Sequence, residues 1–224
     1  MAMVAGHMDT PSLPHLHEHH GDFAAFRDLM VETAVTRFGS LWWGLWDQLV
    51  APPCAPTIID LGTGPGALLP GLRRRHPDAR IIGVDVQPVM LDTARQNAEV
   101  ARAEIVVSDL ARPLPFADGV ADVVTAVHVV HEVEFPIPFI AEMARILKPG
   151  GVVVVYDWVK QPLADYVGDA VLDEYQIQHF REHCLYEPRD LEWMLGRAGF
   201  KVRETLTRRG GRYVIIVAEK VGSL

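Results

Sequence analysis

The segment Ile58–Leu72, IIDLGTGPGALLPGL, constrains the fold of this chain more than any other part of the sequence. An apolar run ends in an aspartate, a turn with three closely spaced glycines follows, and a helical pattern begins directly after the turn. Nucleotide-binding α/β sheets place such a turn after their first strand, because glycine tolerates positive φ angles and lets a ligand approach the backbone. The segment therefore predicts a strand, a ligand-binding turn and a helix, and the glycines alone fit two different cofactors.

The chain after this segment alternates between apolar runs of strand length and helical stretches. Strands are predicted at residues 57–61, 80–86, 104–110, 120–127, 152–158, 201–207 and 213–220, and helices at residues 67–75, 88–101, 138–148 and 187–200. Alternation of this kind implies an α/β fold with a doubly wound, mostly parallel sheet and helices on both faces. The last two predicted strands are joined by RRGGR and form a hairpin, which puts one antiparallel strand at the edge of the sheet.

The composition divides the chain into parts. Residues 1–21 are polar and contain the histidine-rich tract His15–His20, so we expect a flexible N-terminal arm, with incidental metal affinity as the alternative for the tract. Residues 22–50 carry apolar side chains at helical spacing and predict a helical lid. Residues 51–224 form the α/β domain, with a cap insertion at 159–187 after the carboxyl end of a central strand, where such sheets place ligand loops.

The overall charge and the cysteine content limit the partners and the location of the protein. A formal net charge of -8 argues against nucleic acid, because phosphates require a basic surface. Cys54 and Cys184 form no disulfide framework and lack zinc-ligand spacing, which favours the reducing cytoplasm. No apolar run is long enough to span a membrane, so we expect no membrane-spanning segment. The oligomeric state stays open, with a homodimer as one option.

Two residues in the glycine turn bear on the choice of cofactor. Gly62, Gly64 and Ala67 satisfy the pattern of dinucleotide sites, which taken alone would suggest NAD. Asp60 ends the strand, and an anion there opposes a pyrophosphate but suits a ligand with an ammonium group. Pro65 removes one N–H group that would otherwise contact phosphate. The turn therefore indicates an uncharged or cationic nucleoside.

Two further acids lie at the ends of the next two predicted strands. Asp85 can accept hydrogen bonds from ribose hydroxyls, and Asp109 can accept one from an adenine amino group. Each acid alone fits a surface turn or a helix cap equally well. Because Asp60, Asp85 and Asp109 end successive strands, they line one edge of the sheet. S-adenosylmethionine, which carries an ammonium, a sulfonium and a ribose but no phosphate, meets these requirements.

The motifs IIDLGTGPG, IIGVDVQPVMLDTARQNA, DLARPLPFADGVADVV and EMARILKPGG, followed by LGRAGF before the terminal hairpin, resemble those of class I S-adenosylmethionine-dependent methyltransferases. The resemblance spans residues 57–220 and implies a seven-stranded sheet with an antiparallel last strand. It also implies that the methionine and ribose parts of the cofactor lie near Asp60 and Asp85. The remaining cofactor contacts that it implies are Gly62, Gly64, Gly66, Val86, Asp109, Leu110 and Val127.

Methyl transfer depends mainly on positioning, and a base is needed only when the acceptor must lose a proton. His128 and His131 follow the fourth predicted strand, beside the expected methyl group. His131 matches a histidine that is often structural in the family, whereas His128 replaces a residue that is usually apolar. Asp157 ends the fifth strand and either contacts the acceptor or caps a loop. We treat all three as catalytic candidates.

Aromatic and histidine side chains in the lid and the insertion are candidates for contacting the acceptor. Trp43 lies off the helical stripe of its neighbours, and Tyr175, His179, His183 and Tyr186 fall near one face of a predicted helix. A partly exposed lid face is the alternative. His179 and His183 have a spacing that suits a metal, but no glutamate completes a metal motif, so no metal is predicted.

These patterns together predict a methyltransferase that acts on a small, partly apolar molecule with S-adenosylmethionine as cofactor. The alternatives are a protein or tRNA methyltransferase, a non-catalytic cofactor-binding regulatory protein, and an NAD-linked oxidoreductase, which Asp60 and Pro65 disfavour. The acceptor atom, whether oxygen, nitrogen, sulfur or carbon, does not follow from the sequence.

Overall fold

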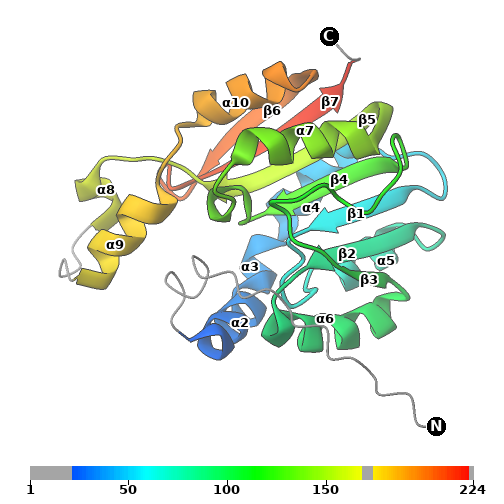
Figure 1. The fold of residues 1–224 in the computed structure, drawn as a ribbon, viewed down its shortest axis with the longest axis horizontal. Helices are drawn as coiled ribbons and strands as arrows, with labels where there is room; N and C mark the ends of the chain where they lie inside the picture. The colour runs from blue at the N-terminus through cyan, green and yellow to red at the C-terminus, as the bar shows by residue number, and fades with distance from the viewer. Residues whose placement is uncertain (1–21, 168–173, 222–224) are drawn as a thin grey trace, which may run out of the picture.

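The computed structural model describes residues 22–167 and 174–221, and Figure 1 shows their arrangement. The predicted N-terminal arm, with its histidine-rich tract, lies outside the described residues. Along the chain the elements are α2 (Phe23–Glu32), α3 (Ala34–Arg37), α4 (Ser40–Leu45), η1 (Trp46–Val50), β1 (Thr57–Leu61), α5 (Leu69–Arg75), β2 (Arg80–Asp85), α6 (Pro88–Ala101), β3 (Glu104–Val107), β4 (Ala121–Val127), η2 (Val130–Glu132), α7 (Pro136–Ile146), β5 (Leu147–Trp158), α8 (Leu163–Val167), α9 (Glu174–His183), α10 (Pro188–Arg197), β6 (Phe200–Arg208) and β7 (Tyr213–Lys220). None of the helices within these ranges is long and apolar enough to cross a bilayer.

The strands form one seven-stranded sheet in the order β3-β2-β1-β4-β5-β7-β6. The ladders from β3 to β5 are parallel, and β7 runs antiparallel to both of its neighbours. The predicted fold class is therefore confirmed, with one correction. The antiparallel strand lies between β5 and β6 rather than at the edge, because β7 pairs with β5 along its whole length and leaves β6 outermost.

Alternate side chains of the strands enter two separate hydrophobic cores. Ile59 and Leu61 of β1 pack on the face covered by α7 and α10, whereas Ile58 packs on the face covered by α5 and α6. β5 does the same with Val153 and Val154. Both faces of a parallel sheet must be covered, which explains the continuously apolar run in this strand.

The N-terminal helices, predicted as one lid, divide into two parts with different environments. α2 buries none of its residues, and it lies beside α6 (Figure 1). Trp42 and Trp46 are buried among the side chains of α5 and β5, so α4 and η1 belong to the core. The large apolar area of two buried tryptophans ties this segment to the sheet. Of the N-terminal helices that the structure describes, α2 and α3 are left to cover the ligand edge.

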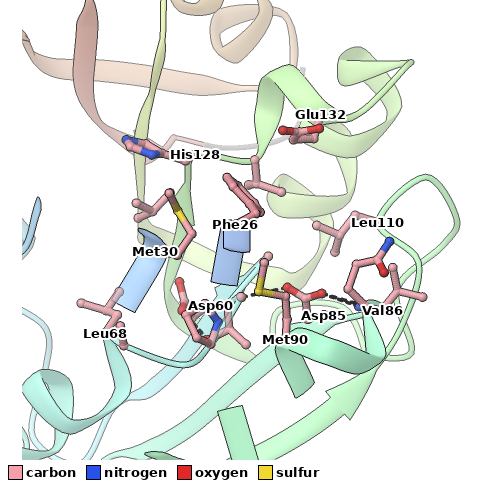
Figure 2. A pocket seen from close by; sticks show the side chains of 18 of the residues that line it. Phe26, Met30, Asp60, Leu68, Asp85, Val86, Met90, Leu110, His128 and Glu132 are labelled. Atoms are coloured by element: carbon pink, nitrogen blue, oxygen red, sulfur yellow. Dashed lines mark hydrogen bonds between the residues drawn. The ribbon is translucent and has the colours of Figure 1, made fainter. Parts of the chain in front are cut away.

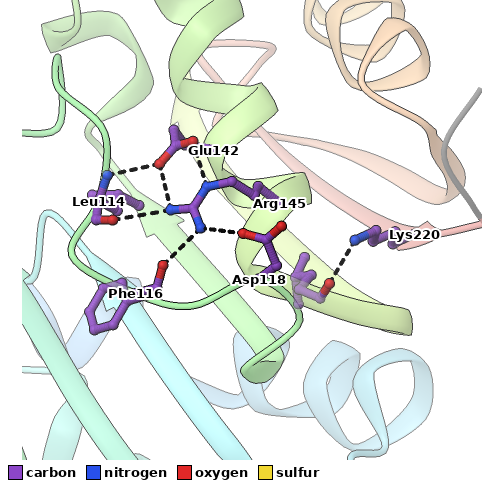
Figure 3. Close-up of polar contacts among 7 residues, drawn as sticks. Leu114, Phe116, Asp118, Glu142, Arg145 and Lys220 are labelled. Carbon is purple, nitrogen blue, oxygen red and sulfur yellow. Dashed lines mark hydrogen bonds and ion pairs between the residues drawn. The ribbon is translucent and has the colours of Figure 1, made fainter.

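The loop after β3 is held by one arginine of α7 (Figure 3). Arg145 donates to the backbone carbonyls of Phe116 (2.8 Å) and Leu114 (3.1 Å) and to the carboxylate of Asp118 (2.8 Å). It also pairs with Glu142, which in turn accepts from the backbone N–H of Leu114 at 2.8 Å. This network connects α7 to the loop that carries Asp109, and so fixes one side of the ligand edge.

We expect Arg145→Leu to lower the free energy of unfolding by about 2–3 kcal/mol, because it leaves Glu142 and two carbonyl groups without their charged donor. Urea denaturation measures the change. Arg95→Leu is the control, since its ion pair with Asp92 is exposed and should contribute about 0.5 kcal/mol or less. Equal losses in the two variants would contradict a role for Arg145 in holding the loop.

Candidate functional site

A cavity opens at the carboxyl ends of β1, β2 and β4, where the winding of the sheet reverses between β1 and β4. Open α/β sheets bind ligands at this position. The lining includes Phe23, Phe26, Met30, Arg37, Phe38, Asp60, Gly62, Thr63, Gly64, Leu68, Asp85, Val86, Met90, Asp109, Leu110, Val127, His128, Val129, Glu132 and Val133. Figure 2 shows Asp60 and Asp85 along one side, His128 and Glu132 along the other, and Phe26 of α2 between them.

The glycine turn has backbone conformations that other residues rarely adopt. Gly62, Gly64 and Gly66 have φ angles of +69°, +55° and +74°. A Cβ atom on Gly62 would lie 2.5 Å from a methyl carbon of Val129, whereas one on Gly64 would meet nothing within 4 Å. Gly66 faces the backbone of α6 rather than the cavity, because its Cβ would come within 3.1 Å of Ala94. The turn therefore leaves open space beside Gly64.

Gly62→Ala and Gly64→Ala should differ in their cost. We expect Gly62→Ala to destabilise the fold by about 3 kcal/mol, since it adds an overlap with Val129 to the strained φ angle. Gly64→Ala should cost about 1 kcal/mol, from backbone strain alone. Thermal and urea unfolding of the two variants measures the difference. A larger loss in Gly64→Ala would mean that the turn is packed differently.

Asp60 is the most deeply buried acid of the cavity, with 3% of its surface exposed. Thr125 of β4 donates to one carboxylate oxygen at 2.6 Å, and Thr63 of the turn donates to the other at 2.7 Å. Burial disfavours the charged form more than these hydrogen bonds favour it, and raises the pKa of Asp60 to about 6. Each oxygen keeps one lone pair for a donor from the cavity.

Asp85 and Asp109 differ in how much of their hydrogen-bonding capacity the protein itself uses. Asp85 Oδ1 accepts from the N–H groups of Val86 and Gln87, and Oδ2 accepts from that of Gly64 at 2.8 Å. One lone pair on Oδ2 is left, so in this conformation Asp85 can bind one further donor. Asp109 accepts from the N–H group of Ala111 through Oδ1. Burial raises the pKa of Asp85.

His128 is a neutral imidazole on the cavity wall. Its backbone has a φ angle of +54°, and its ring stacks on Tyr213 with the ring centroids 5.2 Å apart. Burial, together with the nearby positive charge of Arg37, lowers the pKa of His128 well below its ordinary value. Nε2 is buried and makes no hydrogen bond within the described part of the chain. The ring is therefore uncharged at neutral pH, and its unprotonated nitrogen can accept a hydrogen bond.

His131 is in the opposite state. Its Nδ1 contacts a carboxylate oxygen of Asp157, and its Nε2 lies 3.1 Å from Glu132 Oε1. Burial alone would lower the pKa of His131, but the two carboxylates outweigh burial and raise it to about 10. His131 is therefore an imidazolium at neutral pH and cannot take a proton from an acceptor.

Asp157 is 1% exposed and accepts from the backbone N–H groups of Val130 and Trp158 in addition to His131. Its carboxylate thus caps η2, and it does not line the cavity. Of the two interpretations of Asp157, the structure favours the loop cap. The cavity-facing member of this group is Glu132, which was not a candidate from the sequence.

Of the predicted acceptor contacts, the two whose side chains the structure describes, Trp43 and Tyr186, do not line the cavity. The ring of Trp43 packs on α5, with the guanidinium carbon of Arg75 4.1 Å from the ring centroid. Tyr186 lies beside α7 and α10, in a separate groove. The side chains of Tyr175, His179 and His183 lie outside the described part of the structure. Among the residues that are described, no group of three histidine, cysteine, aspartate or glutamate side chains could hold a metal ion.

Arg37 is a second cavity residue that the sequence did not indicate. It is only 8% exposed, and donates to the carbonyl of Met30 (2.6 Å) and the hydroxyl of Thr33 (3.1 Å). Among the described residues it forms no ion pair with a carboxylate. Buried cations are normally paired. A single arginine in a helical stretch has no sequence pattern that marks it as buried.

The winding of the sheet, the glycine turn and the acids at the carboxyl ends of β1, β2 and β3 define an α/β enzyme domain that binds a nucleoside cofactor. A family model described as a methyltransferase domain matches residues 59–155. A demethylmenaquinone methyltransferase of Thermus thermophilus is 29% identical over 171 residues, which cover 68% of this chain and 78% of that protein. The next three curated relatives are covered over 56%, 29% and 44% of their lengths.

Two solved structures show the same fold. One is a Haloferax volcanii methyltransferase in complex with the activator Trm112, with a TM-score of 0.73, 20% identity and coverage of 90% of this chain and 98% of that one. The other is an S-adenosylmethionine-dependent methyltransferase from Aquifex aeolicus, with a TM-score of 0.68, 20% identity and coverage of 88% and 98%. Residues 59–155 therefore match a methyltransferase domain, and the described chain has the fold of S-adenosylmethionine-dependent methyltransferases.

The raised pKa of Asp60 makes a prediction about cofactor binding. An ammonium group requires the ionised carboxylate, so the affinity for S-adenosylhomocysteine should fall as the pH drops through about 6, by roughly tenfold per unit below that value. Calorimetric titration at several pH values from about one unit below this pKa to about two units above it measures the dependence. Asp60→Asn should bind more weakly above pH 7 and lose most of the dependence. A slope that is unchanged in Asp60→Asn would assign the titration to another group.

Proposed function

We propose that this enzyme methylates a small ring-shaped molecule that is largely apolar and carries hydroxyl groups. The observation that carries the proposal is the cover over the cavity. Phe26 and Met30 of α2 lie across the cavity from Asp60 and Asp85 (Figure 2), and Phe23, Val129 and Val133 add to its apolar lining. An apolar pocket with a few polar groups is typical of small-molecule sites.

The cavity residues fit the cofactor in charge and in space. The open position beside Gly64 leaves room for the nucleoside, and Asp85 keeps one lone pair for a ribose hydroxyl. Asp60 and Arg37 have opposite charges and line the same cavity, which would match the ammonium and carboxylate of the methionine part. Asp109, with Leu110 and Val86, would contact the adenine.

The bound cofactor supplies a methyl carbon that is activated for displacement by its positively charged sulfur. The protein has to exclude water and orient the acceptor. α2 covers the cavity, and the apolar side chains of Phe26 and Met30 make it a poor environment for water. His128, as a neutral imidazole on the wall, is the group that would receive a proton if the acceptor has to lose one.

The name of the Thermus relative supports a ring-shaped acceptor, since that protein is named as a methyltransferase of demethylmenaquinone. A macromolecular acceptor, as in protein or tRNA methyltransferases, is the second candidate. We retain it because the Haloferax neighbour forms a complex with the activator Trm112. A polypeptide or tRNA would have to displace α2, which buries little and so has a low cost of movement. The cytoplasmic location, the absence of nucleic-acid partners and a homodimer remain predictions from the sequence.

Methyl transfer to a quinol tests the proposal directly. The purified chain is incubated with S-adenosylmethionine labelled in its methyl group and with chemically reduced demethylmenaquinone, and the quinol is analysed by mass spectrometry. We expect the label in the ring product, together with release of S-adenosylhomocysteine. Asp85→Ala, which loses a cofactor contact, should reduce the rate at least about tenfold at limiting cofactor.

Two outcomes would contradict the proposal in different ways. If the label were transferred to protein or to tRNA and none were found in the quinol, the acceptor would be a macromolecule rather than a small molecule. Tight binding of S-adenosylhomocysteine without transfer to any of these acceptors would favour a cofactor-binding protein without catalysis.

A further inference from the structure

The carboxylate of Glu132 lies among valine side chains on the cavity wall, and the exposed Glu134 also lines the cavity. Val129, Val130 and Val133 surround it in sequence and are buried, and the side chain of Glu132 is 12% exposed. Glu132 lines the cavity on the side away from Asp60 and Asp85 (Figure 2). It therefore lies away from the groups that would hold the ribose and the methionine ammonium, and on the same side as His128.

A chain of contacts from β5 holds this carboxylate in place. The backbone of η2 donates to Asp157, whose carboxylate contacts His131 Nδ1, and His131 Nε2 lies 3.1 Å from Glu132 Oε1. A carboxylate beside an apolar cavity costs free energy unless a cation compensates it, and the imidazolium of His131 does so. The carboxylate is thus held beside a cation in one orientation. Burying a charged pair costs more free energy than burying apolar side chains of the same size, so packing alone does not explain a glutamate at this position.

We propose, on the basis of the proposed function, that Glu132 binds a hydroxyl group of the methyl acceptor and selects neutral, hydrogen-bond-donating rings over anionic ones. The imidazolium fixes Oε1, and the carboxylate has further lone pairs that can accept from a ligand. His131 and Asp157 are positioning residues for Glu132. The acceptor ring lies between Phe26 and Val133, with its hydroxyl toward Glu132.

Charge decides the class of acceptor. A carboxylate or phenolate group would face the like charge of Glu132, whereas a neutral hydroxyl donates to it without repulsion. A cationic amine would also pair with Glu132, but it would meet the positive charges of Arg37 and His131 and the sulfonium of the cofactor. A neutral donor satisfies Glu132 and avoids both kinds of repulsion.

Three naphthalene probes test the proposal on the complex with S-adenosylhomocysteine. 1-Naphthol has a hydroxyl donor, 1-methoxynaphthalene has the same ring without a donor, and 1-naphthoate is an anion. Calorimetric titration at neutral pH should give an affinity for naphthol about tenfold or more above that for the other two probes, the effect of one hydrogen bond to a charged acceptor.

Glu132→Met should abolish this preference while the affinity for methoxynaphthalene and for S-adenosylhomocysteine stays within about twofold. Glu132→Gln, which keeps the shape and one acceptor oxygen, should lose the discrimination against naphthoate. Glu99→Gln is the control, because this exposed glutamate of α6 does not line the cavity. It should leave the preference unchanged.

His131→Gln separates positioning from a general structural effect. It should lower the affinity for naphthol, in the same direction as Glu132→Met does, and leave that for methoxynaphthalene unchanged. A purely structural lesion would weaken the two neutral probes alike, and that outcome would overturn the role of His131.

The same naphthol preference in wild type and in Glu132→Met, or tightest binding of naphthoate by the wild type, would overturn the proposal and leave the proposed function intact. Binding of none of the three probes, with normal binding of S-adenosylhomocysteine, would reject the ring-shaped acceptor and this inference with it.

Discussion

The buried carboxylate of Asp60 joins the parts of the protein on which the site depends. It ends β1, accepts from Thr125 on the neighbouring strand β4, and accepts from Thr63 in the glycine turn. β1 and β4 are the strands between which the winding of the sheet reverses, so this one group ties together the two halves and the turn. Because it is buried, its charge is costly until a cation arrives. The position that organises the sheet edge is therefore also one that favours a positively charged ligand.

The two histidines after β4 show how the same side chain acquires opposite states from its surroundings. His128 lies among the rings of Tyr156 and Tyr213 and close to the cation Arg37, so it stays neutral. His131, three residues on, lies between two carboxylates and is charged. One is a neutral hydrogen-bonding group on the cavity wall, and the other contacts two carboxylates. The two rings point in different directions. The ring of His128 contacts Tyr156 and Tyr213, whereas that of His131, within η2, contacts Asp157 at the end of β5.

Most of the fold could be predicted from the sequence, because it is encoded in local patterns. Strand length, glycine turns and helix ends are properties of short segments, and the acids at the strand ends follow once the strands are parallel. The place of β7 between β5 and β6 was not predictable in this way, since a hairpin specifies that two strands pair but not which of them also pairs with a third. Trp43 was expected near the acceptor because it departs from its helical stripe, yet that departure turns it toward α5.

The sequence by itself determined the cofactor class of this protein, because an aspartate and a proline in a glycine turn carry their chemistry wherever the turn is placed. Only the tertiary structure decided what faces the acceptor. Arg37 and Glu132 come from separate segments with no motif of their own, and they reach one cavity through the packing of α3 and the bend at η2. Whether a charged side chain is solvated or buried depends on what packs over it. Neighbours in space, rather than in sequence, set that outcome.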